Sequence, residues 1–248
     1  MAKVNQKYFT EEVTFTSHFE EETHIFVKHY LPKNYSNEKK YIHLIFQHGM
    51  IEYHLRHEDF FEYLLIEFAG EIIISVMDLL GHGFSGGHRA YVDKFETFCF
   101  DMVSFLNICE KRFPDERVRQ RIVGSHSLGG LVTLKTVMSE AYELPFNIHQ
   151  LIFCNPCVSP KLDVPGFTLK IIEKIPSFLR KIRVPLIYDA YDLSHDKEKA
   201  ISFMHDHLIS KSVTVKLALE TKKATDNINS YSYFCKIPSF FILSGEDI

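Results

Sequence analysis

The chain has 248 residues, of which 46% are hydrophobic and 24% are charged. This balance is typical of a globular protein and excludes disordered, collagen-like and low-complexity classes. Lys and Arg (28) nearly balance Asp and Glu (32), which leaves a net charge of −4. The sequence has no excess of basic residues to bind a phosphate backbone, so a nucleic acid partner is not expected.

The first residues contain no apolar run of the kind that a signal peptide needs. The longest apolar stretches, such as Ile72–Met77, are too short to span a bilayer. Five cysteines without disulfide-like spacing favour a reducing compartment, and we expect a cytoplasmic protein. Cys154 and Cys157 form a lone Cys-x-x-Cys motif, which we interpret as two buried thiols. No metal-ligand spacing is found, so neither a metal nor a cofactor is expected.

The expected strands fall into two groups. Alternating apolar residues over Glu12–Phe19 and His24–Tyr30 predict an antiparallel hairpin. Continuous apolar runs bounded by turn residues then indicate strands that are buried on both faces of a parallel sheet. These runs are Ile42–Phe46, Ile72–Met77, Ile122–Gly124, Leu151–Cys154 and Phe240–Leu243.

Helical spacing of apolar residues lies between these runs. It extends over Phe60–Phe68, with Gly70 as a natural stop, over Phe95–Cys109 and over Leu128–Met138. Strands that alternate with helices indicate βαβ units. The predicted fold class is therefore α/β, with a mostly parallel, doubly wound sheet behind the N-terminal hairpin.

The stretch from about Pro156 to Ser232 breaks this alternation. It contains a polar turn at Asp192–Lys197 and a helical pattern over Ala200–Leu219. We interpret it as a helical insertion, not as an independent second domain, because the sheet pattern resumes at Ile237–Gly245. The predicted organisation is a core over residues 1–155, an insertion over 156–232 and the end of the core over 233–248.

The candidate nucleophile is Ser127, in the segment Ser125-His126-Ser127-Leu128-Gly129 that joins an apolar strand to a helix. A serine on a sharp strand-to-helix turn projects its hydroxyl above the sheet edge, and its neighbours must be small. Ser125 replaces the first glycine of the usual Gly-x-Ser-x-Gly pattern. The amides at the start of the helix favour a developing oxyanion.

Two further turns follow buried strands. Gln47–Met50 has the position of a loop that supplies a second oxyanion donor, so the donors would be the amides of Met50 and Leu128. The glycine-rich turn Asp78–Gly86 lets the chain pass close to the same edge of the sheet.

Along the chain the motifs run in the order Gln47–Met50, Asp78–Gly86 and Ser125–Gly129. Together they resemble the α/β-hydrolase family, and specifically its monoacylglycerol lipase and bacterial lysophospholipase branch, which is grouped with the serine aminopeptidases. The resemblance extends from about Glu12 to Ile248. It implies that Ser127 is the nucleophile, that Met50 and Leu128 form the oxyanion hole, and that no metal or organic cofactor takes part. His48, Gly49 and Gly129 belong to the supporting motifs.

The resemblance also implies that the insertion is a cap over an acyl-chain pocket. The apolar cap residues either form a lid face or only pack the cap onto the core. They are Phe167, Leu169, Ile172, Phe178 and Leu179. Basic residues within Lys170–Arg183 make peripheral membrane contact conceivable, although a solvated helix face is the more common outcome.

In chain order the acid follows the nucleophile, and Asp247 is the expected acid, with Glu246 as the alternative. The resemblance places the general base on a histidine in a later loop, after one more strand. The sequence ends at Ile248, so we expect this chain to be a shortened form, without the final strand and helix of the family. His126 neighbours Ser127, but we expect it to point away on the tight turn.

The predicted function is that of a serine ester hydrolase that cleaves lipid monoesters, such as lysophospholipids or monoacylglycerols, through an acyl-enzyme. One alternative is a catalytically inactive, hydrolase-like protein that binds lipid or a partner and lacks the base. Another is a peptidase or small-ester esterase of the same fold. The sequence does not indicate an oligomeric state.

Overall fold

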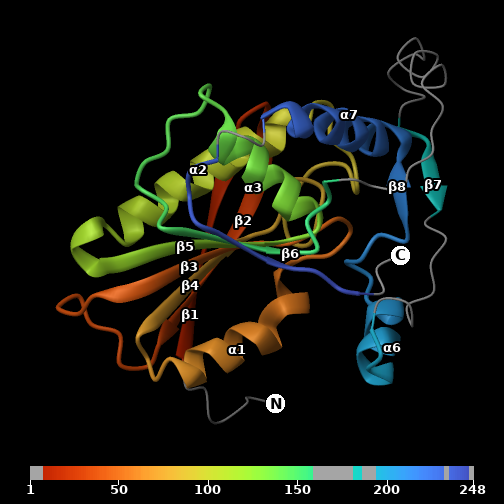
Figure 1. Ribbon diagram of the computed structural model, residues 1–248. Coiled ribbons are helices and arrows are strands. Elements are labelled where there is room, and N and C mark those ends of the chain that lie inside the picture. Colours follow the sequence, from red (N-terminus) through yellow and green to blue (C-terminus); the bar gives the residue numbers. More distant parts are fainter. Residues whose placement is uncertain (1–7, 159–180, 186–193, 232–234, 246–248) are drawn as a thin grey trace.

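The computed structural model describes residues 8–158, 181–185, 194–231 and 235–245 (Figure 1). A seven-stranded sheet has the order β1-β2-β4-β3-β5-β6-β9, and β7 and β8 form a separate pair. The strands are β1 (Tyr8–Ser17), β2 (Glu20–Pro32), β3 (Tyr41–Gln47), β4 (Ile72–Met77), β5 (Val118–His126), β6 (Gln150–Cys154), β7 (Arg183–Pro185), β8 (Ser212–Thr214) and β9 (Ser239–Ile242).

The helices alternate with the strands of the core. They are η1 (His54–His57), α1 (Glu58–Glu67), α2 (Glu96–Arg112), η2 (Asp115–Arg117), α3 (Leu128–Met138), α6 (Lys197–His205) and α7 (Val215–Tyr231). The predicted core strands and helices are all present, and Leu128–Met138 has the predicted bounds. The strand predicted at Ile122–Gly124 is longer, since β5 begins at Val118.

The predicted N-terminal hairpin is confirmed. Strands β1 and β2 pair antiparallel, with Val13 opposite Val27. The turn between them is anchored by Asp101 of α2, whose carboxylate accepts hydrogen bonds from the Ser17 hydroxyl at 2.9 Å and the His18 amide at 2.8 Å. The hairpin is thereby fixed to the helical layer as well as to the sheet.

The central strands β3, β4, β5 and β6 run parallel, as their continuous apolar sequences predict. Every residue of β4 is buried. The one hydroxyl in β4, that of Ser75, lies 2.7 Å from His29 Nδ1 on β2 and 2.8 Å from His43 Nε2 on β3. The Ser75 side chain therefore links β4 to both of its neighbours in the sheet, β2 and β3.

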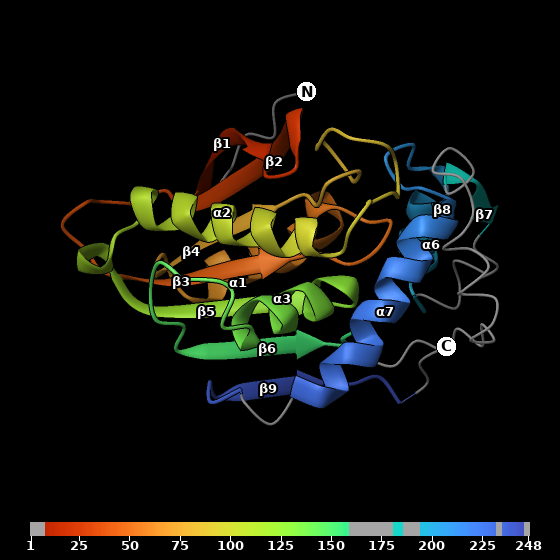
Figure 2. The same ribbon diagram turned by 90° about the horizontal axis from the view of Figure 1, so that it is seen from above.

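Helices cover both faces of the sheet (Figures 1 and 2). On one face, Phe61 and Leu65 of α1 pack against apolar side chains of β3 and β4. On the other face, α2, α3 and α7 pack side by side over the sheet, and their buried apolar side chains join those of the strands and loops in the larger core cluster. This three-layer arrangement is that of a doubly wound α/β domain.

The segment between β6 and β9 differs from the prediction in one respect. The helical pattern over Ala200–Leu219 is not one helix, because α6 ends at His205 and α7 begins at Val215, with the short strand β8 between them. Side chains account for the interruption. The Asp206 carboxylate accepts a hydrogen bond from the Leu208 amide, and the Thr214 hydroxyl accepts one from the amide of Leu217 and so caps α7.

Part of the predicted insertion lies outside the described residues. This applies to the lid-face candidates Phe167, Leu169, Ile172, Phe178 and Leu179, and to the basic residues Lys170, Lys174 and Arg180. Among the described residues, no helix combines the length and the apolarity that crossing a membrane requires.

Candidate active site

Ser127 occupies the turn between β5 and α3, with φ 48° and ψ −117°. A positive φ is strained for a residue with a side chain and costs about 1–3 kcal/mol, so the surrounding structure must hold it. The Ser127 amide donates to the Cys154 carbonyl at 3.0 Å, and the Ser127 carbonyl accepts from the amides of Gly130 and Cys157, each at 2.9 Å. This is the geometry expected of a nucleophile elbow.

Two glycines let the turn and the loop after β3 approach each other. A Cβ added to Gly129 would lie 2.4 Å from the carbonyl oxygens of Gln47 and His48, and one added to Gly49 would lie 2.9 Å from Ser127 Cβ. Both positions therefore require glycine. Ser125, which replaces the first glycine of the usual pattern, is buried, so the fold accommodates a hydroxyl there.

The predicted oxyanion residues flank Ser127 on two elements. Leu128 is the first residue of α3, where the helix dipole places partial positive charge on the free amides. Met50 follows Gly49 in the loop after β3. Since Gly49 lies against Ser127, the structure brings this loop and the elbow together. The roles of Met50 and Leu128 remain predictions.

His48 fixes the backbone of two loops at once. Its Nε2 accepts a hydrogen bond from the Leu79 amide at 2.9 Å, and its Nδ1 lies 2.8 Å from the Gly49 carbonyl. The first bond requires an unprotonated Nε2, so the ring is neutral with its proton on Nδ1. Burial lowers the pKa of His48, which agrees with this neutral state.

Asp78 organises the glycine-rich turn after β4. Its buried carboxylate accepts hydrogen bonds from the amides of His54 and Phe84, both at 2.9 Å, and lies 3.0 Å from His54 Nδ1. Burial raises the pKa of Asp78, but the hydrogen bond and charge of His54 outweigh it, so the net shift is downward. The ionised carboxylate thus holds this turn beside the start of η1.

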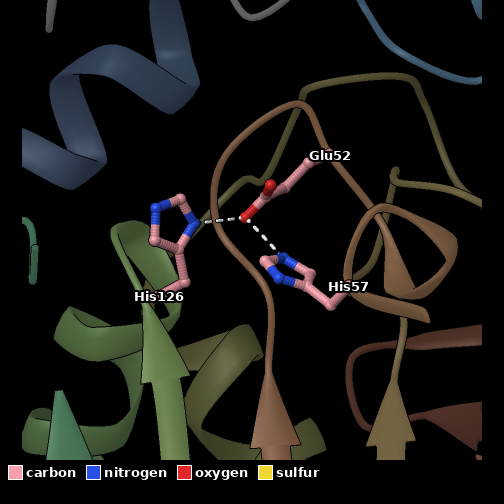
Figure 3. Close-up of side chains that lie close together, drawn as sticks. All are labelled: Glu52, His57 and His126. Atoms are coloured by element: carbon pink, nitrogen blue, oxygen red, sulfur yellow. Dashed lines mark hydrogen bonds and ion pairs between the residues drawn. The ribbon is translucent and has the colours of Figure 1, made fainter. Parts of the chain in front are cut away.

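Sequence reasoning missed a cluster that lies next to Ser127 (Figure 3). Glu52, from the loop after β3, has its Oε1 2.6 Å from His126 Nδ1 and 3.2 Å from His57 Nε2. The same oxygen accepts the Gly49 amide proton at 2.5 Å. Burial alone would raise the pKa of Glu52, but the two histidines hold it well below its ordinary value. The Nδ1 atom of His126 is engaged by Glu52, and its expected orientation away from Ser127 stays a prediction.

The two acid candidates, Asp247 and Glu246, lie outside the described residues. The chain leading to them is placed by Asn155, which follows β6 and has φ 42°. Its amide donates to the Ile242 carbonyl at 2.9 Å, and its Oδ1 accepts from the Ser244 amide at 2.7 Å. Asn155 therefore clamps the end of β9 to the end of β6. The sequence analysis did not identify this residue.

All five cysteines are free thiols. Burial raises the pKa of Cys157 to about 11, so this thiol is protonated at neutral pH. Its backbone contributes to the elbow through the bond to the Ser127 carbonyl.

A family profile described as serine aminopeptidase, S33 matches residues 38–248. Monoglyceride lipase of Rattus norvegicus is 26% identical over 179 residues, which are 71% of this chain and 56% of the rat protein. The uncharacterized protein YnbC of Escherichia coli (strain K12) is 23% identical over 176 residues, which are 68% of this chain and 28% of that protein. The chain thus spans about half or less of these curated relatives.

Solved structures of similar fold include a soluble variant of monoglyceride lipase from Saccharomyces cerevisiae in complex with a substrate analog. It has a TM-score of 0.74 at 16% identity, covering 96% of this chain and 77% of the other. Monoacylglycerol lipase of Paleococcus ferrophilus has a TM-score of 0.66 at 16% identity, covering 95% and 77%. At these identities the likeness shows a shared fold, that of the α/β-hydrolases.

Proposed function

Because this chain belongs to the serine aminopeptidase S33 family of α/β-hydrolases, we propose that it is a serine ester hydrolase that cleaves lipid monoesters through Ser127. The observation that carries this proposal is the strained backbone of Ser127 at the start of α3, held by three backbone hydrogen bonds. Strained residues of this kind cluster at active sites, and Ser127 combines the strain with a hydroxyl at the start of a helix. The similarity to monoglyceride lipases supports an ester of a single fatty acid as the substrate.

The proposed reaction has two steps. The Ser127 hydroxyl oxygen attacks the ester carbonyl, the alcohol leaves, and water then releases the fatty acid from the acyl-enzyme. The amides of Met50 and Leu128 stabilise the oxyanion in both steps, and Asp247 is the proposed acid. Attack requires a base that removes the hydroxyl proton, since a serine hydroxyl is otherwise a weak nucleophile.

The described part of the insertion supports a cap over this site. Asp206 Oδ2, just after α6, accepts a hydrogen bond from the Tyr53 hydroxyl at 2.8 Å. Arg56 of η1 donates to the Lys199 carbonyl at 3.3 Å and lies over the ring of Phe203. The insertion thus contacts the loop that carries Met50. We propose residues 156–232 as the cap and place the acyl chain beneath it.

Labelling with a fluorophosphonate probe, read by intact mass, tests the nucleophile without requiring the right substrate. We expect one probe per chain in the wild type and none in Ser127→Ala. Ser104→Ala is the matched control, because Ser104 lies on α2, away from the elbow, and alanine is favourable in a helix. Far-UV circular dichroism shows that each protein is folded. Absence of labelling in folded wild type would contradict the proposal and favour the inactive, lipid-binding alternative.

A substrate panel then distinguishes a lipid monoester hydrolase from a small-ester esterase and from a peptidase of the same fold. It contains 1-oleoylglycerol, lysophosphatidylcholine, p-nitrophenyl acetate and an aminoacyl p-nitroanilide. The proposal expects fatty acid release from a lipid monoester at a higher kcat/KM than hydrolysis of the acetate. Cleavage of the anilide alone would instead identify a peptidase, as the family description allows.

A further inference from the structure

The cluster beside the elbow gathers three metal-ligand side chains from three elements. Glu52 comes from the loop after β3, His57 from the end of η1, and His126 from the end of β5. One ligand atom from each, a carboxylate oxygen and two imidazole nitrogens, lies within 4.8 Å of the other two. Figure 3 shows both rings turned toward the same carboxylate oxygen.

These distances come close to those of a metal site. Zn²⁺ binds imidazole nitrogen and carboxylate oxygen at about 2.0–2.2 Å, so tetrahedral ligand atoms are about 3.3 Å apart. The observed separations from Glu52 Oε1 are 3.2 Å to His57 Nε2 and 2.6 Å to His126 Nδ1. Side-chain rotations that move the ligand atoms by about 1 Å therefore suffice to admit an ion.

The His57 ring supplies an independent observation. Its Nε2 is buried and, within the described part of the chain, makes no hydrogen bond of acceptable geometry, although it lies in ion-pair range of Glu52. A buried ring nitrogen without an aligned partner is uncommon in a folded protein. A cation beside this nitrogen would give it a partner, with Glu52 as a second ligand.

We propose that Glu52, His57 and His126 bind a single divalent ion of the Zn²⁺ class. Two imidazoles and one carboxylate are the donor set that borderline-soft ions prefer, whereas Mg²⁺ and Ca²⁺ select oxygen ligands. The His126 side chain is 33% exposed, so the cluster is accessible from solvent. This inference is independent of the proposed hydrolase function, since binding is measured without any substrate.

The site lies at the junction of the elbow and the loop that carries Met50. The Glu52 oxygen that would meet the ion also accepts the Gly49 amide proton. A Cβ on Gly49 would lie 3.1 Å from His126 Nδ1 and 2.9 Å from Ser127 Cβ. A bound ion would therefore restrain both segments at once and sit next to the candidate nucleophile.

The test is competition for Zn²⁺ between the purified 248-residue chain and a chromophoric chelator. We expect one ion per chain, and a loss of affinity of at least about tenfold in His57→Gln. His207→Gln is the matched control, because His207 is an exposed histidine that does not belong to the cluster. Mg²⁺ and Ca²⁺ at the same concentrations should not displace Zn²⁺. Wild type that fails to compete, or affinity that His57→Gln leaves unchanged, would overturn the proposal.

Co²⁺ spectroscopy of the wild type keeps the test decisive if His57→Gln does not fold. The expected visible spectrum is that of four- or five-coordinate Co²⁺ with nitrogen and oxygen ligands. A thiolate-to-metal charge-transfer band would place the ion at the cysteines instead. That band, or the weak spectrum of an octahedral ion, would refute the assignment.

Discussion

Acidification should destabilise the fold through His82, and the contribution of this residue can be isolated. The ring belongs to the glycine-rich turn Asp78–Gly86 and is buried, with Nδ1 2.9 Å from the Leu80 carbonyl and with Nε2 unpaired among the described residues. Burial lowers the pKa of His82 from 6.5 to about 4. Between these values the unfolded chain binds a proton that the folded protein does not, so stability is lost as the pH falls from 6.5 toward 4.

The magnitude follows from the two pKa values. Lowering the pKa of His82 from 6.5 to about 4 corresponds to about 3 kcal/mol at low pH. At pH 5 the unfolded state is almost fully protonated at this residue and the folded state is not. The expected loss from His82 between pH 7 and pH 5 is therefore about 2 kcal/mol.

Urea unfolding of wild type and His82→Asn at pH 7 and pH 5 measures this contribution. The Asn amide can donate to the Leu80 carbonyl as Nδ1 does, but it does not titrate. The variant is less stable at both pH values, because it leaves space in the core. We expect its loss of unfolding free energy on acidification to be smaller than that of the wild type by about 2 kcal/mol.

Other titrating groups, such as Asp78, act in both proteins and cancel in this difference. An equal loss in wild type and variant would refute the reasoning, because it would mean that His82 is protonated or exposed in the folded state. A larger loss in the variant would refute it as well.

Three further expectations rest on local geometry. Gly129→Ala places a methyl group 2.4 Å from the carbonyl oxygens of Gln47 and His48, and should lower the urea-unfolding free energy by about 1–3 kcal/mol; Gly245→Ala, whose added Cβ meets no atom of the described residues within 4 Å, is the control. Asp101→Ala removes the acceptor of two hydrogen bonds from the hairpin turn and should cost about 1–3 kcal/mol in the same assay, whereas Asp101→Asn, which keeps one acceptor oxygen, should cost less. Burial raises the pKa of Cys99 to about 11 and that of Cys109 to about 12, so both thiols should resist Ellman's reagent in the native protein and react in urea; native reactivity of either would contradict their burial.

Much of the core could be predicted because its signals are local. Continuous apolar runs predicted β3, β4 and β6, and the serine between a strand and a helix predicted the nucleophile elbow. The prediction of a helical pattern over Ala200–Leu219 was wrong between α6 and α7. The apolar periodicity continues there, but the side chains of Asp206 and Thr214 stabilise a break in the helix. Their hydrogen bonds to the backbone end one helix and start the next.

The Glu52 cluster could not be read from the sequence. Its three members are separated along the chain and belong to no motif with metal-ligand spacing. Only the parallel pairing of β3 with β5 brings the loop after one strand to the end of the other. Asn155 was missed for a related reason, since its partners are the end of β9 and the residue that follows it.

The hydroxyl of Ser75 has a consequence for how the chain finds its strand alignment. The sequence of β4 is otherwise apolar, and sliding it by two residues would keep the same faces buried. Only in the native alignment does Ser75 meet His29 on one side and His43 on the other. A slipped pairing would leave the Ser75 hydroxyl, His29 Nδ1 and His43 Nε2 buried without these hydrogen bonds, at about 1–3 kcal/mol each. The Ser75 hydroxyl thus specifies the register of β4, whose other side chains are all apolar and would allow several equivalent alignments during folding.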